Sequence, residues 1–323
     1  MGVRLRAVGR SASAYPAAVS SARLLALASA GSEAAAGVAT PRAASAGSGV
    51  SRHRGQHVFW RLEKPAGGAL FLLGSLHFGD DRLYPLPAAI EAAYQSCATV
   101  ILETDLRLTQ LPAFAVLMQR KAEWPPGQSL ADALEAADLE AFRGQARRLG
   151  LEPSWLERYR AWYCANQLLS LALRQSGVDS SRGIDRVFCG RCQADGKAIE
   201  AFESPEFQID LFAGLSDASG AALLRESLAE IAHVRGFVEA MLTAYLAGDL
   251  AALEELVTTS FDRSPELRER FLTSRNASWQ AALTARAGSC PGDDLVVVGT
   301  GHLLGAHGLV ASLRQAGFAV TRL

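Results

Sequence analysis

The spacing of apolar and polar positions changes along this chain of 323 residues, and each change predicts a different element. Two strand-like runs come first, 57–64 and 69–77, separated by the turn signal Pro65-Ala-Gly-Gly68. A helical pattern over 86–97 and a short apolar run over 99–106 follow. Short continuous apolar runs fit buried strands of a mainly parallel sheet. The order strand, helix, strand is the unit of α/β folds.

The middle of the chain is predominantly helical in its periodicity. One interruption is a candidate strand over 197–204. Glycines close two of the expected helices in the manner of C-caps, and Pro153 opens the second of them. The helices predicted here span 130–150, 154–177 and, roughly, 217–247, 249–260 and 265–286.

The C-terminal part returns to strand, helix and strand, over 294–302, 308–317 and 318–323. We therefore predict an α/β fold with a central, mainly parallel sheet built from both ends of one domain, residues 55–323. A large helical insertion, roughly 106–195 and 204–287, would cap this sheet.

Residues 1–54 have a different composition from the rest of the chain. They are rich in Ala, Ser, Gly and Arg, with Glu33 as their one acid, and we expect them to lie outside the fold. Three interpretations compete: a signal peptide cleaved near Ala28-Ser29-Ala30, an organellar transit peptide, and a disordered tail. We rank export, to the periplasm or the medium, ahead of a cytoplasmic or organellar location.

Bulk charge and hydropathy narrow the classes of partner. Lys and Arg number 32 against 33 Asp and Glu, so no basic field indicates a nucleic acid. No apolar stretch reaches the roughly 18 residues of a membrane-spanning helix. Five cysteines are too few for a disulfide scaffold, and Cys189-Gly-Arg-Cys192 lies in a predicted helix without a second pair, so plain thiols are favoured over a redox or zinc role.

Two similar segments carry the candidate chemistry. Gly74-Ser-Leu-His77 and Gly299-Thr-Gly-His302 each follow an apolar strand, so each histidine falls at or just past a strand end. In open α/β sheets ligands bind at that edge, and glycine allows a sharp turn or a close approach of the backbone. A single histidine there is usually structural, but two in matching contexts favour a shared site.

Carboxylates are expected at the same edge. Glu103 lies near the carboxyl end of the predicted strand over 99–106, and Glu203 directly follows "KAIEAF" in the candidate strand over 197–204. Two histidines and a carboxylate form a common ligand set for a divalent metal that keeps a position open for water. Such a metal lowers the pKa of its water to about 7 and polarises a carbonyl. Glu203 would be a further ligand or a general base.

With these residues in place, the chain resembles the TraB/GumN family, which is related to the Tiki proteins. The resemblance covers residues 57–323 and rests on an ordered set of segments. They are "FLLGSLHFGDDRLYPLPAAIEAAYQSCATVILETDL" from 71, "GIDRVF" from 183, "EAFESPEFQIDLF" from 200, "YLAGDL" from 245, "RNASWQ" from 275 and "VVVGTGHLLGAHGLVASLRQAGFAVTRL" from 296.

The resemblance implies a metal-dependent protease that uses two Gly-x-x-His motifs and acidic residues. Matched by position, His77 and His302 are the motif histidines, and Glu103 and Glu203 are the acids. Arg275 and Asn276 match the family's Arg-Asn pair, and such an arginine stabilises an oxyanion or holds a substrate carboxylate.

The leading hypothesis is a metal-dependent hydrolase of a peptide or amide bond, with Zn, Mn or Co held by His77, His302 and Glu103. A second hypothesis keeps the site without the metal: His77 is the general base of an esterase-like reaction, and Glu103 orients its imidazole. A third is a binding protein for a small molecule such as haem, as in the distantly related ChaN-like proteins. The substrate, peptide or small molecule, and the oligomeric state stay open.

Overall fold

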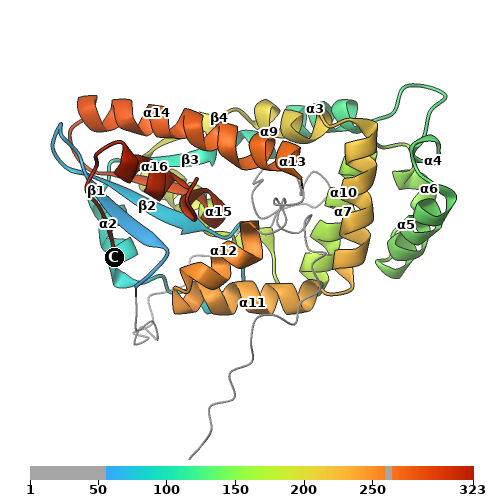
Figure 1. Ribbon diagram of the computed structural model, residues 1–323, viewed down its shortest axis with the longest axis horizontal. Coiled ribbons are helices and arrows are strands. Elements are labelled where there is room, and N and C mark those ends of the chain that lie inside the picture. Colours follow the sequence, from blue (N-terminus) through green and yellow to red (C-terminus); the bar gives the residue numbers. More distant parts are fainter. Residues whose placement is uncertain (1–55, 259–263) are drawn as a thin grey trace, which may run out of the picture.

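The structure is a computed structural model, and it describes residues 56–258 and 264–323 (Figure 1). The expected targeting segment, 1–54, lies outside the described residues. A six-stranded sheet of order β4-β3-β5-β2-β1-β6 forms the centre of the fold. Its strands are β1 (Phe59–Glu63), β2 (Ala69–Ser75), β3 (Thr99–Thr104), β4 (Ala198–Glu203), β5 (Asp294–Gly299) and β6 (Val320–Arg322).

Neighbours from β4 to β2 are parallel, whereas β1 runs antiparallel to both β2 and β6. The expectation of a mainly parallel sheet with strands from both ends of the chain is therefore confirmed. β5, from the C-terminal part, lies between β3 and β2. Its register sets Ser75 beside Gly299, so the two Gly-x-x-His segments leave adjacent strands side by side.

Strand burial explains the sequence pattern. Every residue of β5 is buried, and β2 and β3 each have one residue that is only partly buried, as expected for strands covered on both faces. Gly74 remains within β2 and does not turn the chain, contrary to one expected role. A Cβ at Gly74 would lie 2.4 Å from Val58 Cγ1 and 2.9 Å from Thr300 Oγ1, so the glycine allows close packing.

The helices cover the sheet and extend beyond it; in Figure 1 the sheet lies at the left and α4–α7 and α10 at the right. α8 packs on β3, β4 and β5, and α7 packs on α10. The longer helices are α2 (Ala88–Ser96), α3 (Pro112–Ala122), α5 (Ala136–Arg148), α7 (Ala161–Gln175), α8 (Ile184–Asp195), α9 (Pro205–Ala213), α10 (Asp217–Ile231), α11 (Val234–Ala247), α12 (Leu250–Thr258), α14 (Ser274–Ser289) and α16 (Leu309–Gln315).

Short helical segments complete the chain. They are η2 (Asp81–Leu83), η3 (Leu108–Gln110), α4 (Leu130–Ala133), α6 (Pro153–Leu156), η4 (Ser180–Arg182), α13 (Pro265–Arg268), the π-helical turn η6 (Glu269–Thr273) and α15 (Thr300–Leu303).

Three long predicted helices are each divided in two. The helix predicted over 154–177 is α6 and α7, because the segment between them pairs elsewhere: Arg160 N–H donates to Ala122 O at 2.7 Å, and Tyr159 bridges to Glu123. This pairing outweighs the continuous helical periodicity. The helix over 130–150 is likewise α4 and α5, and that over 217–247 is α10 and α11 with a break at His233.

A charged cluster closes the amino edge of the parallel strands. Lys64, after β1, donates to Asp294 at the start of β5 over 2.8 Å, and the lysine side chain is fully buried. Arg286 of α14 reaches both oxygens of Asp294, at 2.9 and 2.8 Å, and also Glu200 at 2.7 Å. Two cations face two carboxylates, so this cluster is balanced in charge.

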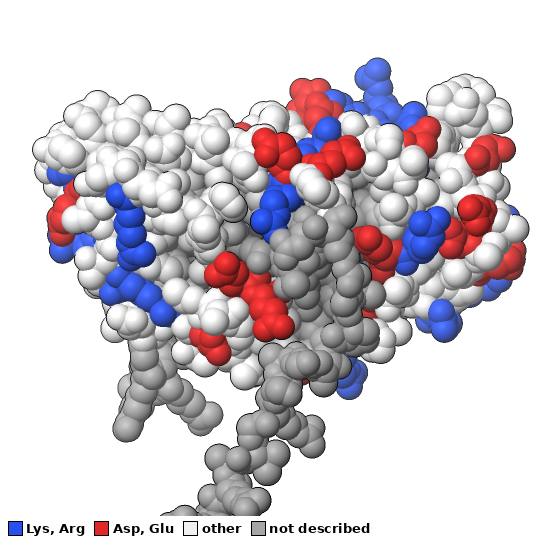
Figure 2. Space-filling view, in the orientation of Figure 1, with Lys and Arg blue, Asp and Glu red and all other residues white. Residues whose placement is uncertain are grey.

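Within the described residues, no helix has the length and apolar character needed to cross a membrane. Charged side chains of both signs are interspersed on the face shown in Figure 2, which agrees with a net charge of −1. Cys189 and Cys192 lie in α8 as predicted, and both are buried free thiols. Burial raises the pKa of Cys189 to about 11, so this thiol is not a nucleophilic thiolate at neutral pH.

Candidate active site

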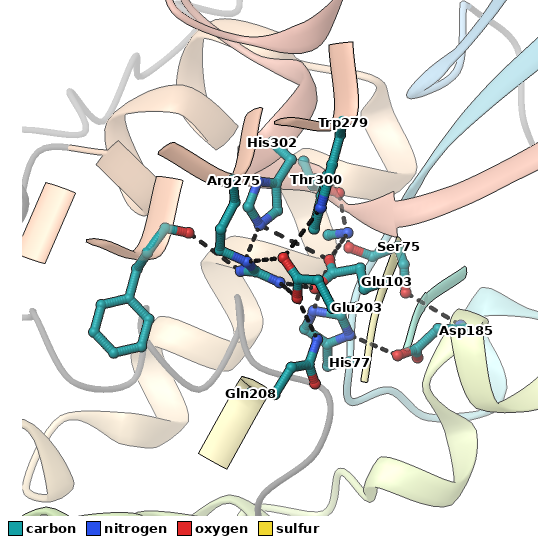
Figure 3. A network of polar contacts seen from close by, with 12 residues as sticks. Ser75, His77, Glu103, Asp185, Glu203, Gln208, Arg275, Trp279, Thr300 and His302 are labelled. Atoms are coloured by element: carbon teal, nitrogen blue, oxygen red, sulfur yellow. Dashed lines mark hydrogen bonds and ion pairs between the residues drawn. The ribbon is translucent and has the colours of Figure 1, made fainter. Parts of the chain in front are cut away.

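The ends of four parallel strands bring the expected polar residues together at the carboxyl edge of the sheet (Figure 3). His77 lies two residues beyond β2, and His302 lies in α15, which begins directly after β5. Glu103 is the penultimate residue of β3, and Glu203 is the final residue of β4. His77, His302 and Glu103 are buried. The side chain of Glu203 is 6 % exposed.

Arg275 lies at the centre of this group, with 2 % of its surface exposed. Its Nη2 donates to Glu103 Oε2 at 2.7 Å and to Glu203 Oε2 at 2.9 Å, and its Nε donates to Glu203 Oε1 at 2.8 Å. The remaining nitrogen, Nη1, donates to Phe271 O at 3.2 Å and to His302 Nε2 at 3.0 Å. The guanidinium thus joins both glutamates and one of the two motif histidines.

Glu203 has two further donors. Trp279 Nε1 lies 3.0 Å from Glu203 Oε1, and Gln208 Nε2 lies 3.2 Å from Glu203 Oε2. The Trp279 ring also stacks on Phe202 and lies 4.4 Å, centroid to centroid, from the imidazole of His302. Both carboxylate oxygens of Glu203 are therefore saturated with hydrogen bonds, which fixes this side chain as an anchor for Arg275.

His302 is held as a neutral imidazole of one tautomer. Asn276 Nδ2 donates to His307 O at 3.0 Å, which leaves Asn276 Oδ1 to accept from His302 Nδ1 at 2.6 Å. The proton on Nδ1 gives Nε2 a free lone pair, which accepts from Arg275. Burial, and then the nearby positive charge of Arg275, hold the pKa of His302 well below its ordinary value.

His77 has a different arrangement. Its Nδ1 lies 2.7 Å from Asp185 Oδ2, whereas its Nε2 is buried and has no hydrogen-bond partner. Burial alone would lower the pKa of His77, but the Asp185 carboxylate outweighs it and raises that pKa above the ordinary value. Asp185 Oδ1 is also buried without a partner. An unpaired buried nitrogen is costly, and it marks the place where a ligand or a reacting water can bind.

Glu103 connects the two histidines. Its Oε1 accepts from Gly299 N–H at 2.6 Å, and this oxygen lies 3.7 Å from His77 Nε2 and 3.9 Å from His302 Nε2. Burial raises the pKa of Glu103 above its ordinary value, against the opposing charge of Arg275. Both imidazoles therefore direct Nε2 toward one carboxylate oxygen. The structure thus brings the two motif histidines together at this oxygen.

A π-helical turn positions the Arg-Asn pair. α13, η6 and α14 follow one another without a break, and η6 ends directly before Ser274. π-Helical turns are rare and recur at functional sites, because one extra residue rotates the side chains that follow. Arg275 and Asn276, consecutive residues at the start of α14, are both buried in the site.

Asp185 is the main residue that sequence reasoning missed. It belongs to "GIDRVF", which contributed only to the family resemblance, and it is the second residue of α8. Its backbone N–H donates to Ser75 Oγ at 3.2 Å, which ties α8 to the end of β2. The expectation that Glu103 orients the imidazole of His77 is wrong in one respect: Asp185 holds Nδ1, and Glu103 faces Nε2.

The donor atoms have the chemistry of a metal site, but their arrangement is not that of one. Within residues 56–258 and 264–323, no three His, Cys, Asp or Glu side chains are grouped so that they could hold a metal ion. His302 Nε2 accepts from a guanidinium that stays protonated at any physiological pH. Buried His77 Nε2 remains available, but a bound metal would require Arg275 to release His302.

Fold and site together define a mixed α/β protein with a buried charged centre at the carboxyl edge of a mainly parallel sheet. The model of the TraB/PrgY/gumN family matches residues 58–322, and the chain belongs to this family. It is 25 % identical over 264 residues to uncharacterized protein YbaP of Escherichia coli (strain K12) and equally to that of Shigella flexneri; each match covers 81 % of this chain and 95 % of the relative. No solved structure matches the chain.

Proposed function

We propose that this protein is a hydrolase in which His77 acts as the general base. One observation carries the proposal: Asp185 holds Nδ1 of His77 at 2.7 Å, while Nε2 of the same ring is buried and unpartnered. A carboxylate on one imidazole nitrogen fixes the tautomer and leaves the other nitrogen free to accept a proton. The same pairing stabilises the imidazolium that forms.

In this reaction a water bound at His77 Nε2 gives its proton to the ring and attacks the carbonyl carbon of an ester or amide. The negative charge that develops on the carbonyl oxygen is stabilised by the positive field of Arg275, within a site from which bulk water is excluded. The imidazolium of His77 then returns its proton to the leaving group, and the free base is restored. Burial alone would raise the pKa of Asp185, but the charge of the imidazolium and the hydrogen bond from His77 Nδ1 hold it below the ordinary value, so Asp185 stays ionised.

A panel of simple substrates tests this proposal. Purified protein is incubated with p-nitrophenyl acetate, for esters, and with fluorescently labelled casein, for peptide bonds, beside its His77→Gln variant. We expect hydrolysis of one substrate class, reduced by about 10²–10⁴-fold in the variant. Equal hydrolysis by the two proteins, with circular dichroism showing both folded, would contradict the role of His77.

A metal-dependent form of the same hydrolase is the second candidate, and the charge of the site favours it. Two carboxylates, Glu103 and Glu203, face the single charge of Arg275, so these carboxylates exceed the cation when the imidazoles are neutral. A divalent cation would balance them, held by His77, His302 and Glu103, and would act as a Lewis acid on the substrate carbonyl. Loss of hydrolysis in 1,10-phenanthroline or EDTA, restored by Zn²⁺, Mn²⁺ or Co²⁺, identifies this form; full activity in chelator identifies the metal-free form.

A further inference from the structure

We propose that Arg275 and a divalent cation compete for one position in this cluster, so that Arg275 sets the metal affinity of the site. The inference goes beyond hydrolysis, because it concerns binding and holds whichever form of the reaction operates. Its basis is a single nitrogen: His302 Nε2 has one lone pair, and Arg275 Nη1 occupies it at 3.0 Å.

The same guanidinium also uses the oxygens that a cation would need. Arg275 Nη2 takes Glu103 Oε2, while Glu103 Oε1 already accepts from the backbone of Gly299. A metal ligated by His302 and Glu103 would therefore lie against a fixed positive charge a few ångström away. Like charges at that distance in a buried site repel strongly, so the two cations exclude each other.

The surroundings fit a cation other than arginine once the guanidinium is removed. His77 Nε2 is unpartnered, and Asp185 on its Nδ1 is the outer partner that metal-bound imidazoles commonly have. Asn276 is the corresponding outer partner of His302 Nδ1, and it fixes the tautomer of His302 in which Nε2 carries the lone pair. Both Nε2 atoms lie within 4 Å of Glu103 Oε1, at 3.7 and 3.9 Å. Oriented donors are thus already in place around the guanidinium.

Glu203 holds the guanidinium in this position. It accepts from Nε and Nη2 of Arg275, and its own oxygens are fixed by Trp279 and Gln208. Weakening this anchor should free Arg275 while leaving His77, His302 and Glu103 unchanged. Glu203 therefore offers a way to move the guanidinium without deleting it.

Calorimetric titration with Mn²⁺ and Co²⁺ tests the competition, with Arg275→Met beside the wild type. We expect Arg275→Met to bind one equivalent at least about 100-fold more tightly than the wild type, because a buried repulsive charge has gone. The double variant Arg275→Met/His302→Gln should lose that gain. A gain retained in the double variant, or equal or weaker binding by Arg275→Met, overturns the inference.

Glu203→Gln keeps the test decisive if Arg275→Met does not fold. It leaves the guanidinium in the chain but removes the charge that anchors it. Competition predicts an affinity at least about tenfold higher than that of the wild type. If Glu203 were itself a metal ligand, or if Arg275 merely supported the metal, affinity would fall or stay unchanged, and the inference would be wrong.

Discussion

Each of the two edges of the sheet carries a cluster of charged side chains, and one helix supplies an arginine to both. α14 places Arg275 at the carboxyl edge near its start and Arg286 at the amino edge near its end. At the amino edge, Lys64 and Arg286 balance Asp294 and Glu200, and ion pairs join all four side chains. At the carboxyl edge, carboxylates exceed cations, and His77 Nε2 and Asp185 Oδ1 are buried without partners.

If the proposed function is correct, this difference separates charges that stabilise the fold from charges that bind a ligand. A buried ion cluster contributes to a unique structure when every donor and acceptor is satisfied. Unsatisfied atoms cost stability, and they persist where a function requires them. The contrast therefore predicts opposite phenotypes: substitutions at the carboxyl edge should impair chemistry, and substitutions at the amino edge should impair stability.

The largest expected effect concerns Asp185. Asp185→Asn keeps the size of the side chain but removes the charge that fixes His77, so kcat should fall by about 10³–10⁴-fold. The base form of His77 exists above its pKa, so the activity of the wild type should rise with pH through a value above 6.5. This rising limb of the pH–rate profile should shift to lower pH in the variant, because the Asp185 carboxylate no longer raises the pKa of His77.

Asp105→Asn is the matched control. Asp105 lies directly after β3, near the same edge of the sheet, but its carboxylate pairs with Arg107 at 2.7 Å. Its activity should stay within about twofold of the wild type. The pH–rate profiles of the three proteins are compared on the substrate of the panel that the wild type hydrolyses. An unshifted limb in Asp185→Asn would show that Asp185 serves packing alone.

The next effect is on stability, at the other edge. Lys64→Met should lower the free energy of unfolding by about 3–5 kcal/mol, because it leaves Asp294 and its buried surroundings with one cation fewer. Urea titration measures this loss, and hydrolysis per folded molecule should not change. Arg61→Met, which removes an exposed partner of Glu63 on the same strand, should have little effect on either quantity. Loss of activity in folded Lys64→Met would break the separation of the two edges.

The smallest effect is the acid dependence of the amino edge. Burial alone would raise the pKa of Asp294, but its hydrogen bonds from Arg286 and Lys64 lower it below the ordinary value. Stability from this carboxylate is therefore complete above the unfolded pKa of about 4, and it is lost as pH falls through the lower folded pKa. Unfolding free energies of the wild type and Asp294→Asn should converge as the pH is lowered from 6 to 3. A constant difference would mean that Asp294 contributes through packing.

The mainly parallel sheet and the polar residues at its strand ends could be predicted because apolar runs and strand ends are local features, whereas the strand order could not. The runs at 69–77 and 294–302 indicated two buried strands, and the same reasoning placed Glu103 and Glu203 at the ends of two others. That the first two strands are neighbours is known only from their pairing in the sheet. Helix boundaries were less accessible. The break before α7 depends on Arg160 pairing with Ala122, a contact distant in sequence that no periodicity reveals.

The contacts between the side chains of the site could not be predicted for a related reason. Gly183 lies two residues before Asp185, and a Cβ at Gly183 would lie 2.7 Å from His77 O. The start of α8 therefore packs closely on His77, and such a tertiary contact cannot be read from the sequence. The position of Arg275 depends on the π-helical turn η6, which has no sequence signature of its own. Residue types could be proposed from sequence, but which atom each one contacts required the fold.

The central position of β5 also constrains how the molecule is made. β3 and β2 are synthesised early, yet they do not pair with each other, because β5, from residues 294–299, fills the place between them. Residues 294–299 must therefore leave the ribosome before β5 can join β2 and β3, and long-range pairing of this kind is slow. Nascent chains and C-terminal truncations lack His302 together with the strand that aligns the other residues. The charged centre is therefore incomplete until residues 294–302 have been synthesised.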